Sequence, residues 1–553
     1  MVHYLGLRGT KLNAAIGMIA GLDFLGVMGG LLTLNAFVDT FPEIDTSSPT
    51  YKALSPTQQN YNSTIQGISV ASYNLGCFCG SILCLFIGDM LGRRKTIFLG
   101  SAIMIVGAVL QSSAFNLAHL IVGRVITGIG NGLNTSTVPI WQSECSNSHI
   151  RGPLVMVAGS LITGGICISY WLDLGFSFLD PSSVSWRFPI AFQIFFAFVI
   201  LCFVLLLPES PRWLILRGRD DEANSVLAAL LDLATDDPLV RHEFSTIKDT
   251  VLEARQAGWR DLLMMGEDRH LHRIVLAYVN QMFQQISGIN LITYYAATIY
   301  QNNIGLSGLL SRILAACNGT EYFIASLLPI FICERVGRRP LMLIGAAGMS
   351  FSMIILAITT SYVKQSGPGI TAAIFLFVFN TFFAWGWLGM TWLYPAEIVP
   401  LRIRAPANAL STSANWIFNF MVVMVTPVSF SSIGYGTYII FAVINAGIVP
   451  LVYFFYPETA YRSLEEMDTI FRKTTSIFSV VRVANEEPRR YGKKGELLVN
   501  YSTTVEPLGD AGQALEKSIM AGHPLADRDR NLGSEGYSTR ESNISVSALR
   551  PDG

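Results

Sequence analysis

Long apolar stretches alternate with short polar segments from residue 12 to residue 456. Each stretch is roughly 20 residues long, the length with which an α-helix crosses a hydrocarbon core of about 30 Å. The pattern predicts helices at 12–35, 66–88, 97–115, 120–142, 153–175, 187–207, 273–300, 311–333, 340–360, 370–394, 408–430 and 436–456. We therefore expect an all-α membrane protein with twelve transmembrane helices.

The polar segments divide the chain further. The predicted parts are an N-terminal segment (1–11), a six-helix bundle (12–207), a central loop (208–272), a second six-helix bundle (273–456) and a tail (457–553). In the central loop, residues 222–234 and 243–257 have the periodicity of short amphipathic helices. The tail is charged and has no sustained apolar period, so we expect it to be largely disordered, above all over 475–553.

Three charged motifs occur twice, in the same order. They are a first hinge at 88–95 and a second at 334–339, Glu144 with Arg151 and Glu397 with Arg404, and Pro208-Glu209-Ser210 and Pro457-Glu458-Thr459. The second copies follow the first by 245, 253 and 249 positions. Repeats at a nearly constant offset indicate a duplicated unit, which is common among membrane transporters.

Basic residues gather in alternate short loops, whereas the loops between those hold little beyond Lys52 and Lys364. Those in the basic loops are Arg93, Arg94, Lys95, Arg151, Arg335, Arg338, Arg339, Arg402 and Arg404. Because Lys and Arg in short loops favour the cytoplasmic side, we expect these loops and both termini there. The 36–65 loop then lies outside and carries the glycosylation sequence Asn62-Ser63-Thr64. Since Asn62 is close to the second predicted span, its glycosylation stays open.

Composition agrees with a membrane carrier. Only 14% of residues are charged and 51% are hydrophobic, whereas soluble domains carry roughly a quarter charged residues. A net charge of −1 gives no reason to expect a nucleic-acid partner. All eight Cys lie in or beside apolar runs and are interpreted as packing residues, not as disulfide or metal sites. No catalytic constellation stands out, so neither an enzyme nor a cofactor is expected.

The two hinges are predicted to act mechanically. Each hinge follows the second span of its half and joins glycines to arginines that keep their charge. Such arginines bind helix ends, carboxylates or lipid phosphates, or simply anchor the loop in the cytoplasm. The residues assigned to gating are Asp89, Arg93, Arg94, Arg124, Glu144, Arg151, Glu334, Arg338, Arg339, Glu397 and Arg404.

The repeated carboxylate and arginine predict a latch between the halves. We expect Glu144 to pair with Arg404, and Glu397 with Arg151, when the cytoplasmic face closes. An exposed ion pair stabilises by about 0–1 kcal/mol. A pair in a closing interior contributes more, although desolvation opposes it.

These motifs resemble the sugar porters of the major facilitator superfamily over about 12–472. The matching stretches are 88–94, 123–124, 144–152, 208–213, 284–290, 334–339, 395–404 and 457–459. Residues 134–144 and 170–175 are similar to the fungal glycerol/proton symporter branch and its monosaccharide-transporting relatives. The resemblance implies the major facilitator fold, two pseudo-symmetric six-helix bundles around one central site, working by alternating access.

Amides in the seventh predicted span are the candidate substrate site. Gln281, Gln284, Gln285 and Asn290 lie in one apolar run. Unpaired amides in hydrocarbon cost several kcal/mol, so they must face a cavity or bond neighbouring helices. The resemblance places Gln284, Gln285 and Asn290 on the sugar. It adds Trp392 and Asn415 as partners and makes Tyr294 and Tyr295 candidate gate aromatics.

Four positions depart from the family pattern. Gly159 stands where many sugar porters have Gln, Tyr322 where hexose porters often have Asn, Trp141 for the usual Tyr and Asn147 for the usual Pro. The missing amide at Gly159 argues against ordinary hexose recognition and allows a smaller polyol.

Proton coupling is assigned to acids within spans. Asp23 is the sole acid of the first span, and Glu321 lies in the eighth. An intramembrane acid is a functional hypothesis by default. Proton-linked relatives carry an Asp in the first span, which matches Asp23 if one residue is inserted, and Phe24 otherwise. Either acid can instead be structural, paired with a neighbouring helix.

The sequence thus predicts a plasma-membrane carrier of a sugar or polyol, with proton-coupled symport favoured. A facilitative uniporter of the same fold is the first alternative, and a non-transporting sugar sensor the second. The particular sugar, the stoichiometry and the oligomeric state stay open.

Overall fold

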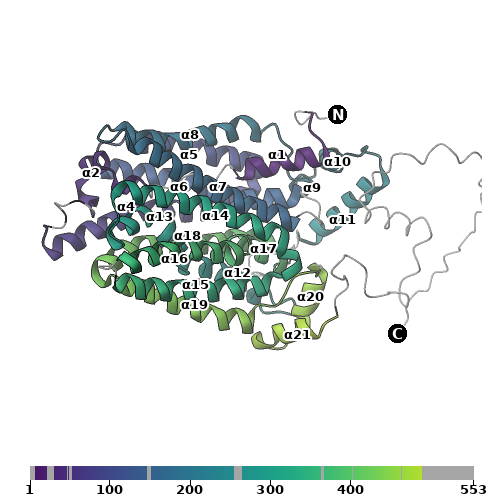
Figure 1. Cartoon of the computed structure of the whole chain (residues 1–553). Coiled ribbons are helices and arrows are strands. Elements are labelled where there is room, and N and C mark those ends of the chain that lie inside the picture. The colour runs from purple at the N-terminus through teal and green to yellow at the C-terminus, as the bar shows by residue number, and fades with distance from the viewer. Residues whose placement is uncertain are drawn as a thin grey trace, which may run out of the picture. The chain divides into compact units, whose positions relative to one another are not determined.

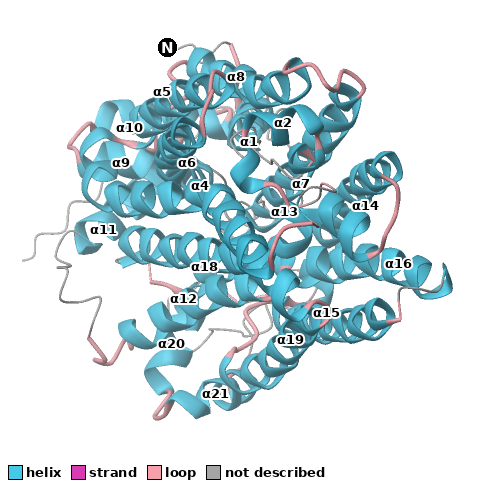
Figure 2. Ribbon diagram, turned by 90° about the vertical axis from the view of Figure 1, so that its left-hand side faces the viewer, coloured by secondary structure: helices cyan, strands magenta, loops and turns pink. Residues whose placement is uncertain are grey.

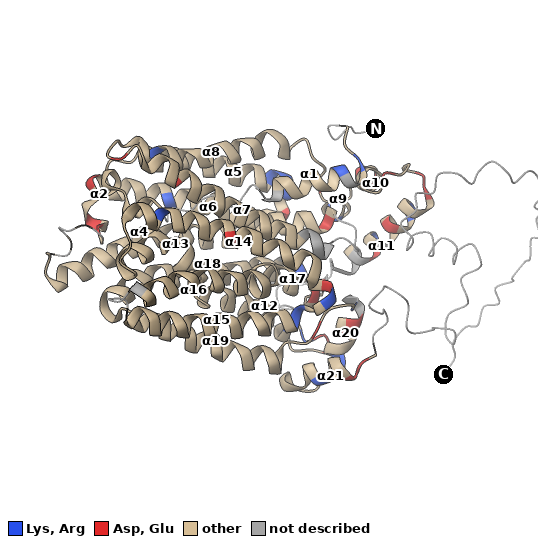
Figure 3. Ribbon diagram, in the orientation of Figure 1, with Lys and Arg blue, Asp and Glu red and all other residues tan. Residues whose placement is uncertain are grey.

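A computed structural model describes residues 6–21, 30–46, 48, 51, 53–145, 151–254, 264–362, 366–400, 403–462 and 464–488. These residues form helices joined by short loops, with no strand among them. The long helices run side by side in one bundle (Figures 1 and 2). Charged residues gather at the two ends of the bundle, and the part between them is almost free of charge (Figure 3). This is the pattern of a chain that crosses a membrane repeatedly.

Nine helices of the described chain are long and apolar enough to span a membrane. They are α4 (Pro56–Leu91), α5 (Arg93–Ser112), α7 (Arg151–Ser177), α8 (Val184–Val204), α14 (Gly308–Val336), α15 (Arg338–Ser361), α16 (Ser366–Phe383) continued by η7 (Ala384–Leu388) and α17 (Met390–Ile398), α18 (Arg404–Ile433) and α19 (Gly436–Phe455). Each coincides with a predicted span, because a run of about 20 apolar residues is a strong and local signal.

The other three predicted spans are interrupted or polar. The first contains α1 (Gly9–Gly21), and residues 22–29 lie outside the described part. The fourth is α6 (Leu117–Cys145), whose buried face is rich in Asn, Thr and Ser. The seventh is broken into α12 (His270–Ile286), α13 (Ile289–Thr298) and the π-helix η6 (Ile299–Asn303). The fourth and seventh predicted spans therefore carry polar residues into the bundle.

Glycine decides where the seventh span breaks. Gly288 has φ +97°, a left-handed conformation that L side chains rarely adopt. A Cβ at this position would also lie 2.9 Å from the ring of Phe441 on α19. The backbone thus ends α12 and restarts as α13 in a new direction, which a side chain at residue 288 would oppose.

Helices from the two predicted halves pack along each other at two places. α4 lies along α18, and α7 lies along α14 (Figure 2). Within the first half, α4 and α6 approach so closely that a Cβ on Gly76 would stand 2.3 Å from the Val125 carbonyl oxygen. Small residues at such crossings are typical of membrane helix pairs.

Short helices occupy the chain between the long ones. At one end of the bundle lie α2 (Asn35–Thr40) with the 3₁₀ turns η2 (Leu31–Thr33) and η3 (Pro42–Ile44). At the other end lie α9 (Pro211–Leu216), α10 (Asp220–Leu231) and α11 (Pro238–Ala254) (Figure 1). The predicted amphipathic helices at 222–234 and 243–257 are present as α10 and α11, shifted by two to five residues at their starts.

The predicted disorder is wrong for the first part of the tail. Residues 464–486 form α20 (Leu464–Lys473), η9 (Ile477–Ser479) and α21 (Val480–Glu486). Met467, Ile470 and Phe471 of α20 are buried, a period of three and four residues that is too short to stand out in a charged segment. Residues 489–553 lie outside the described chain, so disorder there stays a prediction.

Candidate functional site: a central cavity and two charged hinges

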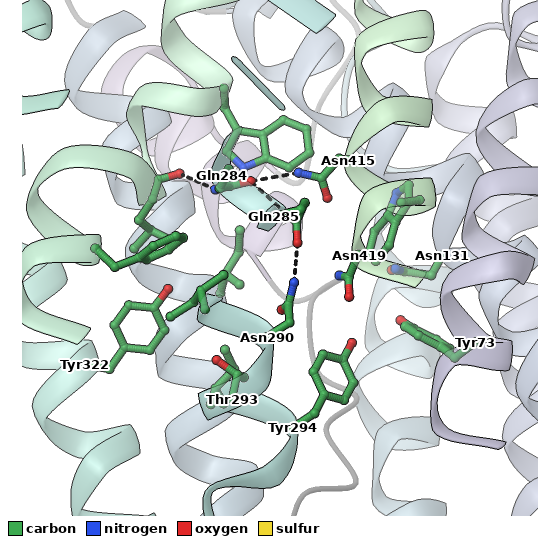
Figure 4. A pocket seen from close by; sticks show the side chains of 17 residues that line it. Tyr73, Asn131, Gln284, Gln285, Asn290, Thr293, Tyr294, Tyr322, Asn415 and Asn419 are labelled. Carbon is green, nitrogen blue, oxygen red and sulfur yellow. Dashed lines mark hydrogen bonds between the residues drawn. The ribbon is translucent and has the colours of Figure 1, made fainter. Parts of the chain in front are cut away.

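A cavity of about 130 Å³ lies among α4, α6, α7, α12, α13, α14 and α18 and the α16–α17 region. Its polar lining comprises Tyr73, Asn131, Gln284, Gln285, Asn290, Thr293, Tyr294, Tyr322, Asn415 and Asn419 (Figure 4). Its apolar lining comprises Ile162, Ile166, Ile289, Phe383, Leu388, Trp392 and Trp416. Elements that are more than 200 residues apart in sequence therefore share one polar chamber.

Five amides form a connected hydrogen-bonded group, which we name the amide cluster: Gln281, Gln284, Gln285, Asn290 and Asn415. The Nδ2 of Asn415 on α18 donates to the Oε1 atoms of Gln281 and Gln284, both at 2.7 Å. Gln285 donates to Gln284 Oε1 at 3.0 Å, and Asn290 donates to Gln285 Oε1 (Figure 4). Four members line the cavity and Gln281 supports them from behind.

Backbone carbonyls of η7 and α17 supply the remaining partners of the cluster. Gln284 Nε2 donates to the carbonyl oxygens of Trp387 and Leu388 at 3.2 and 3.4 Å, in the π-helical segment η7. Gln281 Nε2 donates to the Thr391 carbonyl at 3.2 Å. A π-helical segment departs from the α-helical hydrogen-bond ladder and is frequent at functional sites. Here it positions the amides toward the cavity.

The structure separates the two predicted gate tyrosines. Tyr294 lines the cavity, and its hydroxyl donates to Asn74 Oδ1 at 3.3 Å. Tyr295 is buried away from the cavity and donates to the Val423 carbonyl of α18 at 3.0 Å. One residue turns a side chain by about 100° around a helix, so the two tyrosines point in different directions and only Tyr294 reaches the cavity.

Two departures from the family pattern lie at the cavity, whereas a third, Asn147, lies outside the described residues. A Cβ on Gly159 would lie 3.6 Å from Leu388, which lines the cavity, so the missing side chain is beside the chamber. The residues that α7 does contribute, Ile162 and Ile166, are apolar. Tyr322 lines the cavity and adds an aromatic wall from α14.

Sequence reasoning missed the asparagines that belong to the first half and to α18. Asn131 of α6 lines the cavity, and Asn74 of α4 donates to Asn419 of α18 at 2.9 Å. All three are buried. A lone Asn inside an otherwise apolar span is a costly feature, and this signal could have identified Asn74 in α4.

The buried acids differ in their surroundings. Asp23 and Phe24 lie outside the described residues, so the assignment of the proton site stays a prediction. Glu321 accepts from the Thr381 hydroxyl at 2.5 Å and does not line the cavity. Asp173 of α7, which the sequence reasoning did not consider, is 3% exposed and accepts from the Gly30 amide at 3.1 Å.

The first hinge ties α5 to three acids of its own half. Arg93 forms a two-pronged pair with Glu144 at 3.1 and 3.2 Å and a third contact with Asp89 at 2.7 Å. The carboxylate of Glu209 accepts the backbone N–H groups of Arg93 and Arg94 at 3.1 and 3.2 Å. Negative charge at a helix N-terminus stabilises the helix dipole, so Glu209 fixes the start of α5.

The second hinge repeats this arrangement. Arg338 contacts Glu397 and Glu334, with nearest distances of 2.7 Å. Glu458 accepts the backbone N–H groups of Arg338 and Arg339 at 2.9 and 3.1 Å. Because every partner has its counterpart in the first hinge, the duplication read from the sequence extends to individual hydrogen bonds.

The repeat also explains the departure at Trp141. Its indole nitrogen donates to the Pro208 carbonyl at 3.0 Å. At the corresponding place in the second half, the hydroxyl of Tyr394 donates to the Pro457 carbonyl at 2.9 Å. Indole and phenol each offer one hydrogen-bond donor on a largely apolar ring. Trp141 therefore makes the same contact in the first half that Tyr394 makes in the second half.

The predicted latch partners have other contacts in this structure. Glu144 and Glu397 bind arginines of their own halves, as described above. Arg404 donates to the Val399 carbonyl at 3.1 Å, and the side chain of Arg151 lies outside the described residues. Pairing across the halves therefore stays a prediction.

Arg124 lies far from the hinges. It donates to the Val70 carbonyl at 2.6 Å and lies over the ring of Tyr73. The 20 residues between Arg124 and Glu144 on α6 correspond to about 30 Å of helix. Arg124 is therefore not part of either hinge but lies beside the cavity, and its role in gating stays a prediction.

Comparison with known proteins agrees with this architecture. The model of the family described as "Sugar (and other) transporter" matches residues 12–471. The chain belongs to the sugar porter family of the major facilitator superfamily. The match covers both hinges and the whole cavity, and it confirms the resemblance inferred from the motifs and the multi-pass membrane fold.

Individual members of the family are similar over most of their length. The sugar transporter STL1 of Saccharomyces cerevisiae is 40% identical over 498 residues, which cover 88% of this chain and 86% of that protein. The major facilitator superfamily transporter mfsA of Aspergillus fumigatus is 39% identical, covering 85% and 88%. A structure of the proton:xylose symporter XylE bound to 6-bromo-6-deoxy-D-glucose superposes with a TM-score of 0.69 at 26% identity, covering 83% of this chain and 98% of that one.

Proposed function

We propose that this sugar porter carries a monosaccharide or a smaller polyol such as glycerol across the membrane by alternating access, together with a proton. The observation that supports this most directly is the amide cluster on the wall of the central cavity. Amides donate and accept hydrogen bonds at once, which suits the hydroxyl groups of a polyol. Trp392 adds a flat apolar surface for the carbon skeleton.

The cavity favours a small solute. Its volume of about 130 Å³ is well below the roughly 300–1,000 Å³ of sites for drug-sized ligands. The contribution of α7 is apolar, so hydroxyls are recognised mainly from the α12–α13 and α18 side. This asymmetry supports a solute with fewer hydroxyls than a hexose.

Proton coupling is proposed through Asp23, with Glu321 as the second candidate. The names of the relatives support it in part, since XylE is described as a proton symporter. Uniport by the same fold is the alternative, and it applies if Phe24 occupies the proton position. We further propose a plasma-membrane location, with both hinges and both termini on the cytoplasmic side, because the basic loops favour that orientation.

Uptake in a yeast strain without its own sugar and glycerol carriers tests this proposal. Labelled glycerol, xylose and glucose are offered with and without a protonophore. We expect accumulation of at least one solute and its loss with the protonophore. If protein at the cell surface takes up none of them, transport is contradicted and a sensor is favoured. Uptake that is the same with and without the protonophore identifies a uniporter.

A further inference from the structure

A second cavity, of about 370 Å³, lies outside the central one, along one side of α12 and against the last turns of α19. Its wall includes Val275, Val279 and Met282 of α12, Leu451 and Phe455 of α19, and Ile477 of η9. The side chains that form the rest of the wall are apolar as well, with the exceptions of Tyr456 and His272. The Tyr456 hydroxyl is satisfied, because it donates to the Leu276 carbonyl at 3.0 Å.

His272 is a polar group without a partner in this apolar wall. Its side chain is buried with 4% exposed, and neither ring nitrogen has a hydrogen-bond partner among the described residues. A neutral imidazole has one ring nitrogen that can donate a hydrogen bond and one that can accept. A buried polar group of this kind needs a hydrogen-bond partner from outside the described chain.

The open side of this cavity faces the surroundings of the bundle. Met265, Val275, Leu451 and Ile477 are each between 41% and 48% exposed. In a protein that crosses a membrane, exposed apolar side chains at such a place face the hydrocarbon of the bilayer. The cavity is thus accessible to a lipid chain.

One cation near the cavity is available to a ligand. Arg273 pairs with Asp468, and Arg472 pairs with Asp268 at 2.6 Å. Arg269, whose charge acts on His272, has no ion pair with any residue that the structure describes. A basic side chain beside an apolar cavity at a charged end of the bundle is suited to a lipid phosphate.

We propose that this cavity binds one acyl chain of an anionic phospholipid. The chain fills the apolar space, an ester carbonyl of the lipid accepts a hydrogen bond from His272, and the phosphate lies beside Arg269. Val279 and Met282 belong to the helix that presents Gln284 and Gln285 to the central cavity. The bound chain therefore braces the helix that carries the substrate amides.

Photolabelling of the full-length protein tests this proposal. The purified chain is placed in phosphatidylcholine nanodiscs that contain a small fraction of phosphatidylserine with a photoactivatable acyl chain, and labelled peptides are mapped. We expect labelling within 264–283 and 451–477. Unlabelled phosphatidylserine should compete for it about tenfold better than phosphatidylcholine, the ratio expected for one charge-assisted contact.

Three variants and one control locate the site. Val279→Trp fills the cavity, His272→Phe keeps the ring and removes the nitrogens, and Arg269→Gln removes the charge. Each should reduce the specific labelling several-fold, by roughly the loss of one packing or hydrogen-bonding contact. Val443→Trp, at a position of α19 that is 65% exposed and outside the cavity, should label as the wild type does.

The proposal is overturned if wild-type labelling is equally sensitive to phosphatidylcholine and phosphatidylserine, because lipid then only surrounds the protein. It is also overturned if a sterol or a free fatty acid competes and phosphatidylserine does not. The competition measurement uses the wild type alone, so it remains decisive even if a variant fails to fold.

Discussion

At the scale of single residues, the cavity depends on how amides are oriented. Asn415 binds two acceptors of α12 at 2.7 Å, which turns the carbonyl and the amine of each Gln to a defined side. A substrate hydroxyl then meets preoriented groups, which reduces the entropy lost on binding. If the cavity held neither substrate nor water, the amide groups that face it would lack hydrogen-bond partners, which would cost free energy.

Gln285→Ala and Asn290→Ala should therefore raise the KM of uptake about 3- to 30-fold, the loss of one or two hydrogen bonds. Surface expression is measured in parallel. The adjacent tyrosines provide a matched pair, because Tyr294→Phe removes a hydroxyl beside the cavity whereas Tyr295→Phe removes one that binds α18. KM should change for Tyr294→Phe only. Equal effects of the two substitutions would contradict the assignment of Tyr294.

The candidate proton carriers within the spans can be distinguished by measuring proton-coupled accumulation of the substrate. If Asp23 carries the proton, Asp23→Asn should abolish accumulation against a gradient while downhill exchange survives, because the amide cluster is intact. Substrate-induced alkalinisation of a weakly buffered medium is the measurement. Accumulation that persists in Asp23→Asn would transfer the role to Glu321 or Asp173, both of which lie in the described spans.

At the scale of elements, two glycines fix the breaks on which the site and the second hinge depend. Gly288 ends α12 and Gly337 separates α14 from α15, both with φ +97°. At Gly337 a Cβ would approach Glu458 Oε2 to 2.6 Å, so the hinge carboxylate and a side chain cannot share the space. The left-handed backbone and the clash are two separate reasons for glycine.

Gly337→Ala should lower thermal stability by more than the left-handed backbone alone explains. Gly305 has φ +83° with no atom within 4 Å of an added Cβ, so Gly305→Ala measures the backbone term by itself, about 1–2 kcal/mol. The unfolding temperature of each purified variant in detergent is compared. If Gly305→Ala and Gly337→Ala lose the same stability, the close approach of Glu458 contributes nothing.

At the scale of the whole molecule, the two hinges form a matched pair of charge clusters at one end of the bundle. Each joins one buried arginine to carboxylates from three other segments of its half. Buried ion pairs contribute little net stability, but breaking one by removing a partner is strongly destabilising. Such clusters are suited to hold the ends of helices together in one state of an alternating carrier and to exchange partners in another.

Glu144→Gln should shift the carrier toward the state that is open at the hinge end. Labelling of single cysteines placed at that end of the cavity should increase. A double-mutant cycle with Arg93 measures the contact seen here, and a cycle with Arg404 measures the predicted latch. Coupling with Arg93 but none with Arg404 in any state would show that the carboxylate serves its own half only.

The sequence by itself determined the spans, the duplication, the family and most of the amides of α12, α13 and α18 that line the cavity. Apolar length, charged hinges and breaks at glycine are local properties of a chain in a bilayer, and they are read without knowing how helices face each other. Tertiary structure alone decided which of Tyr294 and Tyr295 faces the cavity, that Asn74, Asn131 and Asn419 join its surroundings, and that Arg124 belongs there and not to the hinges. It also decided that Met467, Ile470 and Phe471 are buried, so that a packed helix, α20, stands where a disordered tail was predicted. The physical reason is that helix rotation and docking are set by contacts between distant segments, and a shift of one residue turns a side chain by about 100°.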